Sequence, residues 1–389
     1  MMKEVAVIGV GMTNFGKFID TPLKELGRRA AWDALKDAGM SPKDIQIAYV
    51  GNACASIITG QVMVLGQIVL KEVGIRNIPI TNVENACASG SSAFREAWMA
   101  VASGIYDVAL AVGVEKLYAG DTSLSTRALA GATEVEYEAN LGLTMPGHWA
   151  LRAKRFMEKY GTTREQLAKV SVKNHRNGCL NPRSQYKKEC TVEEVLNSRM
   201  IADPLTVMSC NPLGDGAAAA VLVSKEIAAR YSTKPVWVAA SVLTTGSYDL
   251  DREISRNQLE GMAGAQAFQM AGIGPEDLDL AEVNDCFTIA EFMRVEGLGL
   301  VPEGEYGTWL DEGWSNIGGK LAVNPSGGLL AKGHPVGATG VAQVAEVVWH
   351  LRGEAEARQV QNAKAGLAHC SGGGVAGDTP ACCVHILKK

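Results

Sequence analysis

The sequence lacks the features that mark membrane, secreted and nucleic-acid-binding proteins. No uninterrupted apolar stretch among its 389 residues reaches the length of about 20 residues that a membrane-spanning helix needs. The nine cysteines include no C-x-x-C pair, and the chain leads from Met1 directly into a predicted strand, so we expect no signal peptide. A net charge of −5 argues against general nucleic-acid binding. We therefore expect a cytoplasmic protein in a reducing compartment, without a metal site.

Aromatic residues are also scarce, at 6% of the chain, whereas there are 43 glycines and 47% of the residues are hydrophobic. Such a composition is typical of a glycine-rich α/β enzyme. A chain of 41.2 kDa is long enough to form two lobes, each with a large buried core.

An internal repeat supports two lobes of similar structure. Residues 34–50 align with residues 267–283 without a gap, and seven of the 17 positions are identical. Each copy reads as a helix, a glycine cap, a Pro-containing turn and a buried strand. Gly214-Asp215 and Gly377-Asp378 then each precede a final apolar strand. The sequence therefore predicts a duplicated α/β unit.

Cys87 lies among small residues, at 85–92, between a predicted strand at 78–83 and a predicted helix at 93–101. A thiol at the start of a helix is close to unpaired N–H groups and to the positive end of the helix dipole, which favour the thiolate. The same N–H groups can hold an oxyanion. This position favours a nucleophile, and a buried structural cysteine is the alternative.

Three further segments carry reactive side chains. Residues 324–340 form a glycine-rich run that presents His334, and a histidine in such a loop is a candidate general base. Residues 282–287 end a predicted strand, and residues 369–374 place a second thiol beside three glycines. These segments supply acid/base groups at the ends of elements.

Together these segments resemble the motifs of the thiolase family. Residues 85–90 resemble its nucleophile motif, residues 333–335 its histidine motif and residues 370–372 its second-cysteine motif, in the family's order along the chain. The similarity extends over essentially the whole sequence. It points especially to the acetyl-CoA acetyltransferases and the archaeal and bacterial thiolases related to sterol carrier protein-2.

The resemblance implies an α/β thiolase fold, with two similar halves in a five-layered αβαβα arrangement and an inserted loop domain. The corresponding boundaries are 1–119 plus 204–232 for the N-terminal half, 120–203 for the loop domain and 233–389 for the C-terminal half. The substrate is then coenzyme A and its thioesters, and no cofactor is bound permanently.

The expected loop domain is locally basic. Residues 151–190 contain eleven Lys or Arg and three acidic residues, which can form either a solvated face or a docking surface for the phosphates of coenzyme A. In thiolases this region covers coenzyme A. The resemblance therefore implies substrate or coenzyme A contacts by five residues, which are His148, Arg183, Lys187, Ser326 and Gly327.

The resemblance also assigns catalytic roles. Cys87 attacks the 3-keto carbon of a 3-oxoacyl thioester, and His334 deprotonates it and stabilises an oxyanion. Asn284 holds a water or the thioester oxygen of the enolate. The backbone amides of Cys87 and Gly372 form a second oxyanion hole.

The second acid/base group is open between two thiols. Most thiolases use the cysteine that Cys370 matches. The branch related to sterol carrier protein-2 has a histidine at position 284, and there a cysteine matching Cys286 can take over the acid/base role. This chain has Asn284 and keeps both cysteines. The asparagine favours Cys370.

Three functions remain open at this point. A thiolase acting on acetoacetyl-CoA or on a bulkier branched or aromatic substrate such as benzoylsuccinyl-CoA is favoured. A thiolase-like synthase or aldolase subunit is one rival, and a non-catalytic acyl-CoA-binding scaffold is another. Retention of Cys87 and Cys370 argues against aldolases that lack the nucleophile. The resemblance implies a homodimer and a small zinc-ribbon/OB-fold partner subunit.

Overall fold

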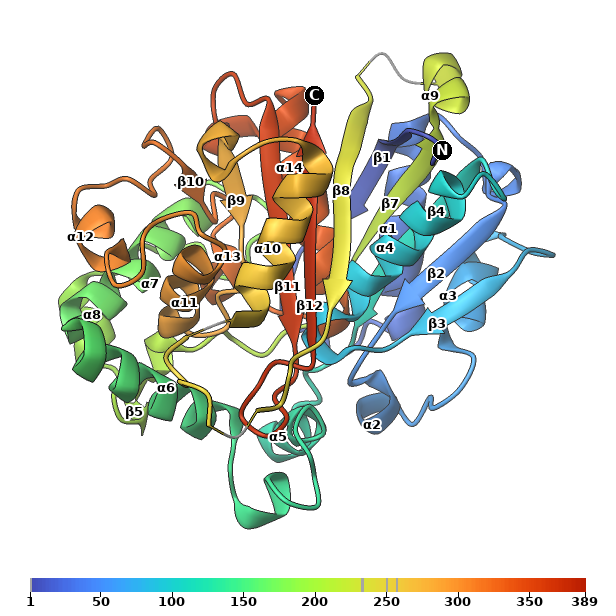
Figure 1. The fold of residues 1–389 in the computed structure, drawn as a ribbon. Helices are drawn as coiled ribbons and strands as arrows, with labels where there is room; N and C mark the ends of the chain where they lie inside the picture. Colours follow the sequence, from blue (N-terminus) through green and yellow to red (C-terminus); the bar gives the residue numbers. More distant parts are fainter. Residues whose placement is uncertain (1, 232–233, 250, 257) are drawn as a thin grey trace.

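Two sets of five strands have the same order in space in the computed structural model, which describes residues 2–231, 234–249, 251–256 and 258–389 (Figure 1). The first set runs β3-β2-β4-β7-β1 and the second β10-β9-β11-β12-β8. The first set comprises β1 (Val5–Met12), β2 (Ile47–Gly51), β3 (Ile80–Val83), β4 (Val108–Glu115) and β7 (Gly216–Ser224). The second comprises β8 (Val236–Thr244), β9 (Leu280–Glu282), β10 (Ala322–Val323), β11 (Ala365–Gly372) and β12 (Ala381–Lys388).

Strand register confirms the internal repeat. Ala48 of β2 pairs with Leu110 of β4, and Ala281, its counterpart in the aligned repeat, pairs with Leu367 of β11. In both sets the first three strands are parallel and the remaining neighbours are antiparallel. Strands β1 and β8 pair briefly and join the two sheets edge to edge. The two halves therefore have one topology.

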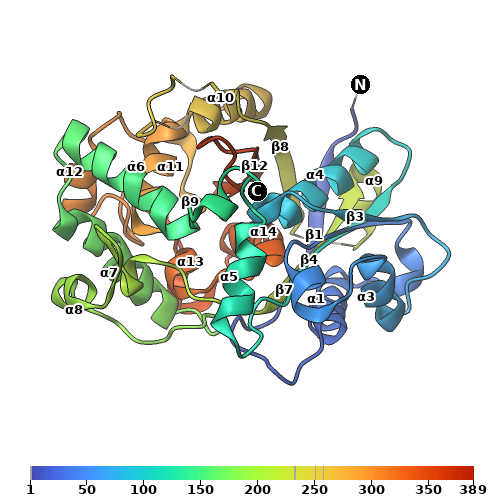
Figure 2. The ribbon, with the colours of Figure 1, turned by 90° about the horizontal axis from the view of Figure 1, so that it is seen from below.

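Helices cover both faces of each sheet and produce the five expected layers. Helices α1 (Leu23–Ala38) and α3 (Leu65–Val73) pack on the outer face of the first sheet. Helices α10 (Gln258–Ala271) and α11 (Thr288–Gly297) pack on the outer face of the second. Helices α4 (Ser89–Ala102) and α14 (Thr339–Arg352) lie between the sheets, as the view from below shows (Figure 2). Strands β1, β4 and β7 are buried on both faces, which explains their continuous apolar sequences.

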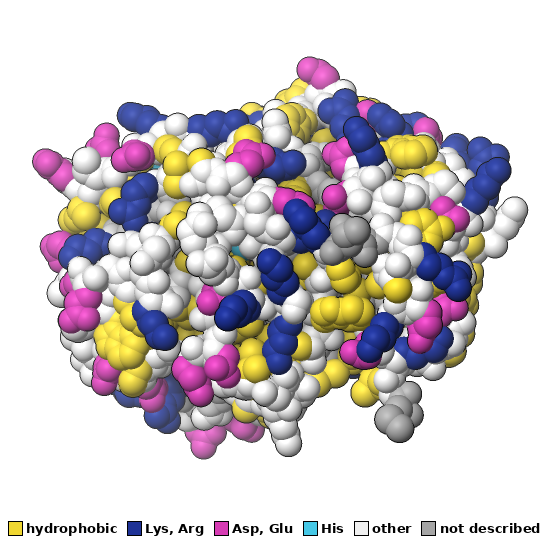
Figure 3. Space-filling model, turned by 90° about the horizontal axis from the view of Figure 1, so that it is seen from above, with side chains coloured by type: hydrophobic (Ala, Val, Ile, Leu, Met, Phe, Trp, Pro, Cys, Tyr) yellow, Lys and Arg dark blue, Asp and Glu magenta, His cyan; other side chains and the backbone are white. Residues whose placement is uncertain are grey.

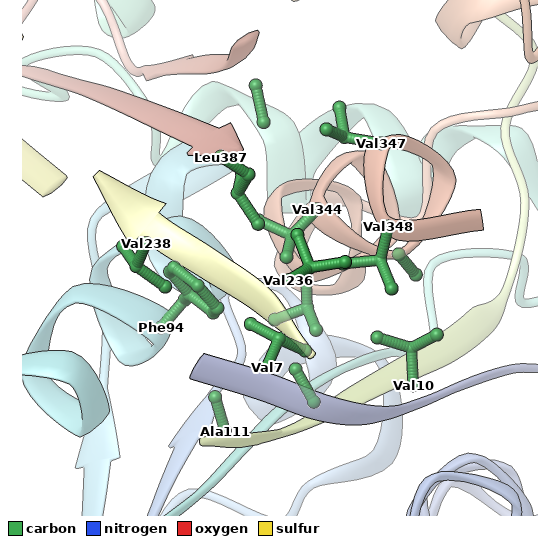
Figure 4. Close-up of a cluster of buried hydrophobic side chains, with 14 of the residues drawn as sticks. Val7, Val10, Phe94, Ala111, Val236, Val238, Val344, Val347, Val348 and Leu387 are labelled. Atoms are coloured by element: carbon green, nitrogen blue, oxygen red, sulfur yellow. The ribbon is translucent and has the colours of Figure 1, made fainter. Parts of the chain in front are cut away.

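The middle layer is held by one apolar cluster. Phe94 of α4 and Val344 of α14 meet side chains of β1 and β8, such as Val7 and Val236 (Figure 4). The two helices start very close together because glycine is present at both. A Cβ on Gly340 would lie 2.3 Å from the amide nitrogen of Ser91 in α4. This contact brings the N-termini of α4 and α14 to one place, where Cys87 and His334 precede them.

The segment between β4 and β7 forms helices at one end of the molecule. Its two long helices are α6 (Met145–Tyr160) and α7 (Arg164–Cys179). They lie beside α11 and α12 (Tyr306–Asp311), and α5 (Thr122–Ala130) lies below the sheets (Figure 1). The remaining short helices are α2 (Ala55–Thr59), α8 (Val192–Asn197), α9 (Lys225–Tyr231) and α13 (Gly328–Ala331), and β5 (Met200–Ala202) pairs with β6 (Leu205–Thr206). The domain boundaries stay a prediction.

Much of the basic charge of residues 151–190 is neutralised locally. Six of the eleven basic residues form ion pairs with carboxylates, namely Lys154, Arg155, Lys159, Arg164, Lys169 and Lys173. Lys173 is fully buried with Glu291, so it contributes to the core rather than to a docking surface. On the upper face of the molecule, basic and acidic side chains are interspersed (Figure 3). Across the residues that the structure describes, no helix is both long and apolar enough to cross a membrane.

Candidate active site

Cys87 is placed at a sharp turn between β3 and α4. It is the middle residue of the 3-10 turn η2 (Ala86–Ala88), and its side chain is half-buried. Ala86 has a φ of 47°, which an alanine adopts only when its surroundings impose it. The backbone is therefore held in a specific conformation immediately before the thiol.

His334 faces this thiol from the second half of the molecule. Its Nε2 lies 3.2 Å from Sγ of Cys87, and its Nδ1 lies 2.7 Å from Oγ1 of Thr339. The Thr339 hydroxyl can donate to the carbonyl of Pro335, 3.1 Å away. The hydroxyl oxygen is then left to accept a hydrogen bond from the N–H group at Nδ1 of His334. This arrangement selects the tautomer with an unprotonated Nε2, which can accept the proton of the thiol.

The ionisation of the pair corrects the expectation that the helix start favours a thiolate. Burial raises the pKa of Cys87 to about 11, although the backbone amides of Gly373 and Cys87 lower it in part. Burial also lowers the pKa of His334 to about 3. Desolvation outweighs the helix dipole here because protein atoms surround the half-buried thiol and the buried imidazole. Near neutral pH the free protein therefore holds a neutral thiol beside a neutral imidazole.

The expected second thiol and the asparagine lie beside the nucleophile. Sγ of Cys370 lies 3.0 Å from the carbonyl oxygen of Cys87, and Nδ2 of Asn284 lies 3.5 Å from Sγ of Cys370. Asn284 also donates to the carbonyl of Ser371 at 3.2 Å, so its amide nitrogen already has protein partners. Cys370 is fully buried, whereas Cys286 is half-buried. Burial and the neighbouring Cys87 raise the pKa of both thiols.

The end of β11 fits against the Cys87 turn because residue 372 is a glycine. A Cβ on Gly372 would lie 2.0 Å from the carbonyl oxygen of Asn85 and 3.0 Å from the amide nitrogen of Cys87. The next residue, Gly373, supplies the amide that stabilises the Cys87 thiolate. The amides of Gly373 and Cys87 thus act on the reacting sulfur, and the expected oxyanion hole of Cys87 and Gly372 stays a prediction.

Of the five residues expected to contact substrate or coenzyme A, His148 lies beside the loop that joins β11 to β12. Its imidazole is 3.8 Å from the position of a Cβ on Gly374. Burial and the nearby cation of Arg152 lower its pKa to about 3, so it is neutral near pH 7. Trp149 stacks on Phe287, with ring centroids 5.8 Å apart.

The structure does not bring the other four together with Cys87. Ser326 is fully buried and its amide and hydroxyl both donate to Glu282, while Gly327 packs against Gly178 of α7. Arg183 and Lys187 line two different cavities, of about 620 and 490 Å³, and Cys87 lines neither. Their expected role in binding coenzyme A stays a prediction.

Two buried carboxylates at the site are absent from the residues predicted from sequence. Glu115 accepts the amide N–H groups of Cys54 and Gly337, and Asp285 accepts those of Leu329 and Leu330. Both hold backbone turns rather than touch the reacting sulfur. The sequence pattern that could have identified Glu115 is a single carboxylate at the end of an otherwise apolar strand.

A cluster of potential metal ligands lies nearby, but two of its three side chains are engaged by protein partners. Glu260, His369 and Cys382 place ligand atoms within 4.8 Å of one another. Glu260 forms an ion pair with the guanidinium of Arg294, and Nε2 of His369 lies 2.8 Å from Oγ of Ser371. The adjacent guanidinium also opposes a cation, so we assign no metal to this cluster.

The sequence matches known families over nearly its whole length. Residues 5–226 match the family described as "Thiolase, N-terminal domain", and residues 249–388 match "Thiolase C-terminal domain-like". These two matches cover both halves of the duplicated fold, including the turns that carry Cys87 and His334.

Named relatives agree. The chain is 46% identical over its full length to the full-length "Acetyl-CoA acetyltransferase" of Methanothermobacter thermautotrophicus. It is 39% identical to "Benzoylsuccinyl-CoA thiolase subunit BbsB" of Thauera aromatica, over 96% of this chain and 95% of that protein. Among solved structures, the "Ltp2-ChsH2(DUF35) aldolase" superposes with a TM-score of 0.85 at 26% identity, covering 99% of this chain and 98% of that one.

Proposed function

The chain belongs to the thiolase family, and we propose that it cleaves or forms 3-oxoacyl-CoA thioesters through an acyl-enzyme on Cys87. The family and its relatives make it an acyltransferase that uses coenzyme A as substrate. The observation that carries the proposal is the 3.2 Å contact between Sγ of Cys87 and Nε2 of His334. A scaffold that only binds acyl-CoA has no need of a nucleophile paired with a base.

The first half-reaction uses this pair. His334 takes the proton of Cys87 at Nε2, and the sulfur attacks the 3-keto carbon. The resulting alkoxide collapses, the bond between C2 and C3 breaks, and the thioester end leaves as an enolate. Cys370 gives its proton to C2 of the enolate, which releases acetyl-CoA and leaves an acyl group on Cys87.

The second half-reaction restores the protein. The Cys370 thiolate takes the proton of incoming coenzyme A, whose sulfur attacks the acyl-enzyme carbonyl. The tetrahedral intermediate collapses, acyl-CoA leaves, and the Cys87 sulfur regains its proton from His334. Condensation is the same sequence in reverse. Backbone amides beside Cys87 stabilise the tetrahedral oxyanion.

The contacts of Cys370 support its role as the second acid/base group. Its sulfur touches the carbonyl of Cys87 at 3.0 Å and receives the amide of Asn284 at 3.5 Å. A donor aimed at sulfur favours the thiolate, which this group becomes after it protonates the enolate. Among the described residues, no side chain donates to the sulfur of Cys286, although its backbone carbonyl accepts from the amide of Asn211.

Acetoacetyl-CoA is the proposed substrate, as the similarity to acetyl-CoA acetyltransferase favours. A second candidate is a larger acyl group that carries a carboxylate. The guanidinium group of Arg152 lies 5.2 Å from the ring of Trp149 and donates to the carbonyl of Gly377, whereas Arg294, on the same ring, is already paired with Glu260. Benzoylsuccinyl-CoA, named for one relative, is an anionic thioester of this class.

Thiolysis rates separate the substrate candidates. Acetoacetyl-CoA, 3-oxohexanoyl-CoA and 3-oxoadipyl-CoA form a suitable panel, because the last two have the same chain length and differ in a terminal carboxylate. Highest kcat/KM on acetoacetyl-CoA supports the first candidate. A preference for 3-oxoadipyl-CoA over 3-oxohexanoyl-CoA that disappears in Arg152→Met supports the second. If the protein cleaves none of the three thioesters, the proposed function is wrong.

We further propose that the chain works as a homodimer together with a small zinc-ribbon/OB-fold subunit. Strand β3 lies at the edge of its sheet and packs beside α3. Val62 and Met63, in the loop before α3, are 70% and 73% exposed. Exposed apolar groups beside an open strand edge are typical of a subunit interface. The solved relative Ltp2-ChsH2(DUF35) carries a second component in its name, which supports the partner. A cytoplasmic location also stays a prediction.

A further inference from the structure

The internal repeat relates the nucleophile turn to the turn that follows His334. Helices α4 and α14 each have 14 residues, and a three-residue 3-10 turn precedes each of them. Ser89 begins one helix and Thr339 begins the other. Cys87, at the centre of the first turn, therefore corresponds to Gly337 at the centre of the second.

The strand register extends this correspondence to the residues that face the two turns. Strand β4 matches β11, so that Gly113 corresponds to Cys370 and Glu115 to Gly372. The contacts agree. Cys370 places its sulfur 3.0 Å from the carbonyl oxygen of Cys87, and a Cβ on Gly113 would lie 2.5 Å from the carbonyl oxygen of Gly337.

Each turn also presents a backbone amide to the end of the matching strand. A Cβ on Gly372 would lie 3.0 Å from the amide nitrogen of Cys87, so glycine leaves that amide open to a substrate oxygen. In the other half the amide of Gly337 donates to the Glu115 carboxylate at 3.0 Å. An anion supplied by the protein thus occupies the counterpart of the oxyanion hole.

We infer that Glu115 is a positioning residue, which fixes His334 by filling this second hole with its own carboxylate. Gly337 lies between His334 and Thr339, the residue that holds Nδ1 of the imidazole. Anchoring the amide of Gly337 therefore fixes both ends of the turn that aims Nε2 at Cys87. The inference rests on the proposed roles of Cys87 and His334.

The surroundings of Glu115 are built for a carboxylate. The side chain is fully buried and accepts from the side-chain amide of Asn52 at 2.9 Å and from the backbone amides of Ala53 and Cys54 at 3.2 and 3.1 Å. These donors come from the loop after β2, so one side chain ties the first half of the protein to the His334 turn in the second. Buried anions require such donors to remain in place.

The charge of Glu115 has the opposite effect on the nucleophile. It raises the pKa of both Cys87 and Cys54. Removing the charge alone would ease ionisation of Cys87 and speed its reaction with an alkylating agent. Loss of the anchor would instead displace His334 and slow the reaction. The first effect speeds alkylation of Cys87 and the second slows it, so the rate in a single variant shows which effect dominates.

The test is alkylation of Cys87 in Glu115→Gln, with iodoacetamide as the probe and peptide mass spectrometry as the readout. Glutamine has nearly the shape of glutamate, but only its oxygen can accept hydrogen bonds. Its NH2 group would face N–H groups that are themselves donors. A pH of about 8 is suitable because burial raises the pKa of Glu115 to about 7, so the wild-type group is then mainly ionised. We expect the rate to fall roughly tenfold to a hundredfold, as for a catalytic group displaced by about 1 Å.

Glu296→Gln is the matched control. Glu296 is also buried, its pKa is also raised to about 7, and it accepts the amides of Gly304 and Tyr306 away from the catalytic turns. This control should alkylate at the wild-type rate. Glu115→Asp retains an anion with a shorter reach. Its alkylation rate should lie between those of wild type and Glu115→Gln. Glu115→Asp also supplies the same comparison if the glutamine variant does not fold.

Unchanged or faster alkylation of a folded Glu115 variant overturns the inference. His334→Ala, measured in parallel, keeps this outcome distinct from failure of the proposed function. If His334→Ala has no effect on the alkylation of Cys87, the base assignment itself is wrong. If His334→Ala slows the reaction and the Glu115 variants do not, only the positioning role of Glu115 is lost.

Discussion

Nε2 of His334 lies 3.2 Å from Sγ of Cys87, although 247 residues separate them in the chain. The contact exists because α4 and α14 start side by side in the middle layer, where Gly340 allows the two backbones to touch. Each half of the duplicated fold thus contributes one member of the reacting pair. Neither half alone contains both the nucleophile and its base.

Replacing the nucleophile gives the first prediction. Cys87→Ser should lower thiolysis by roughly four orders of magnitude or more, because a serine hydroxyl is a far weaker nucleophile in this setting. The thermal midpoint should change little, since the side chain is half-buried and the substitution is small. Mass spectrometry of wild type with acyl-CoA should find the acyl group on Cys87. An adduct on another cysteine would reject the assignment.

The pH dependence of Cys87 follows from burial. Its pKa is raised to about 11 and that of His334 is lowered to about 3, so neither group is charged in the free protein near pH 7. The thiolate fraction therefore grows with each pH unit up to the pKa of the thiol. We expect alkylation of Cys87 by iodoacetamide to keep accelerating between about pH 7 and pH 10. A plateau already near neutral pH would instead reveal a resting thiolate–imidazolium pair.

Thr339 provides a third prediction, on the tautomer of His334. Its hydroxyl lies 2.7 Å from Nδ1, and Thr339→Val removes the hydroxyl while keeping the shape of the side chain. We expect kcat to fall roughly tenfold to a hundredfold, since an incorrectly held imidazole presents its proton to the thiol for part of the time. Thr339→Ser restores the hydroxyl and is the matched control. Equal losses in both variants would assign Thr339 to packing alone.

The sequence predicted the framework of the site well, because that framework depends on local patterns. The repeat at 34–50 and 267–283 predicted two equivalent halves, and the small residues around Cys87 predicted a turn before a helix. The ionisation of Cys87 was predicted wrongly because burial depends on both sheets at once, and no local pattern reports it. Glu115 escaped notice for the same reason, since its partner Gly337 lies in the other half.

Association gives a fourth prediction. The purified chain should scatter light as a dimer, and Val62→Glu combined with Met63→Glu should shift it toward monomers. Both side chains are well exposed in the loop before α3, the helix that packs beside edge strand β3, so charges there would oppose a second copy without disturbing the core. Ile105→Glu changes another exposed apolar residue, in the turn between α4 and β4, and should leave the dimer intact. A stable, active monomer of the unmodified chain would contradict the proposed interface.

The fifth prediction distinguishes the two candidate acid/base thiols, Cys370 and Cys286. A group that exchanges protons with the enolate and with coenzyme A is not needed to acylate Cys87 from a simple acyl-CoA. Its loss should therefore spare single-turnover acylation more than the complete cycle. We expect Cys370→Ala to form the Cys87 adduct but to complete thiolysis roughly two to four orders of magnitude more slowly, the usual cost of a missing acid/base group.

Cys286→Ala is the matched comparison, because this thiol also interacts electrostatically with Cys87 but, within the described part of the chain, makes no side-chain contact like that between Cys370 and Asn284. It should lose less than about tenfold, mainly through packing near the reacting sulfur. Single-turnover acylation and steady-state thiolysis should be measured for both variants. If Cys286→Ala acylates and then stalls while Cys370→Ala turns over normally, the roles are reversed, and Asn284 then orients a buried cysteine that takes no part in proton transfer.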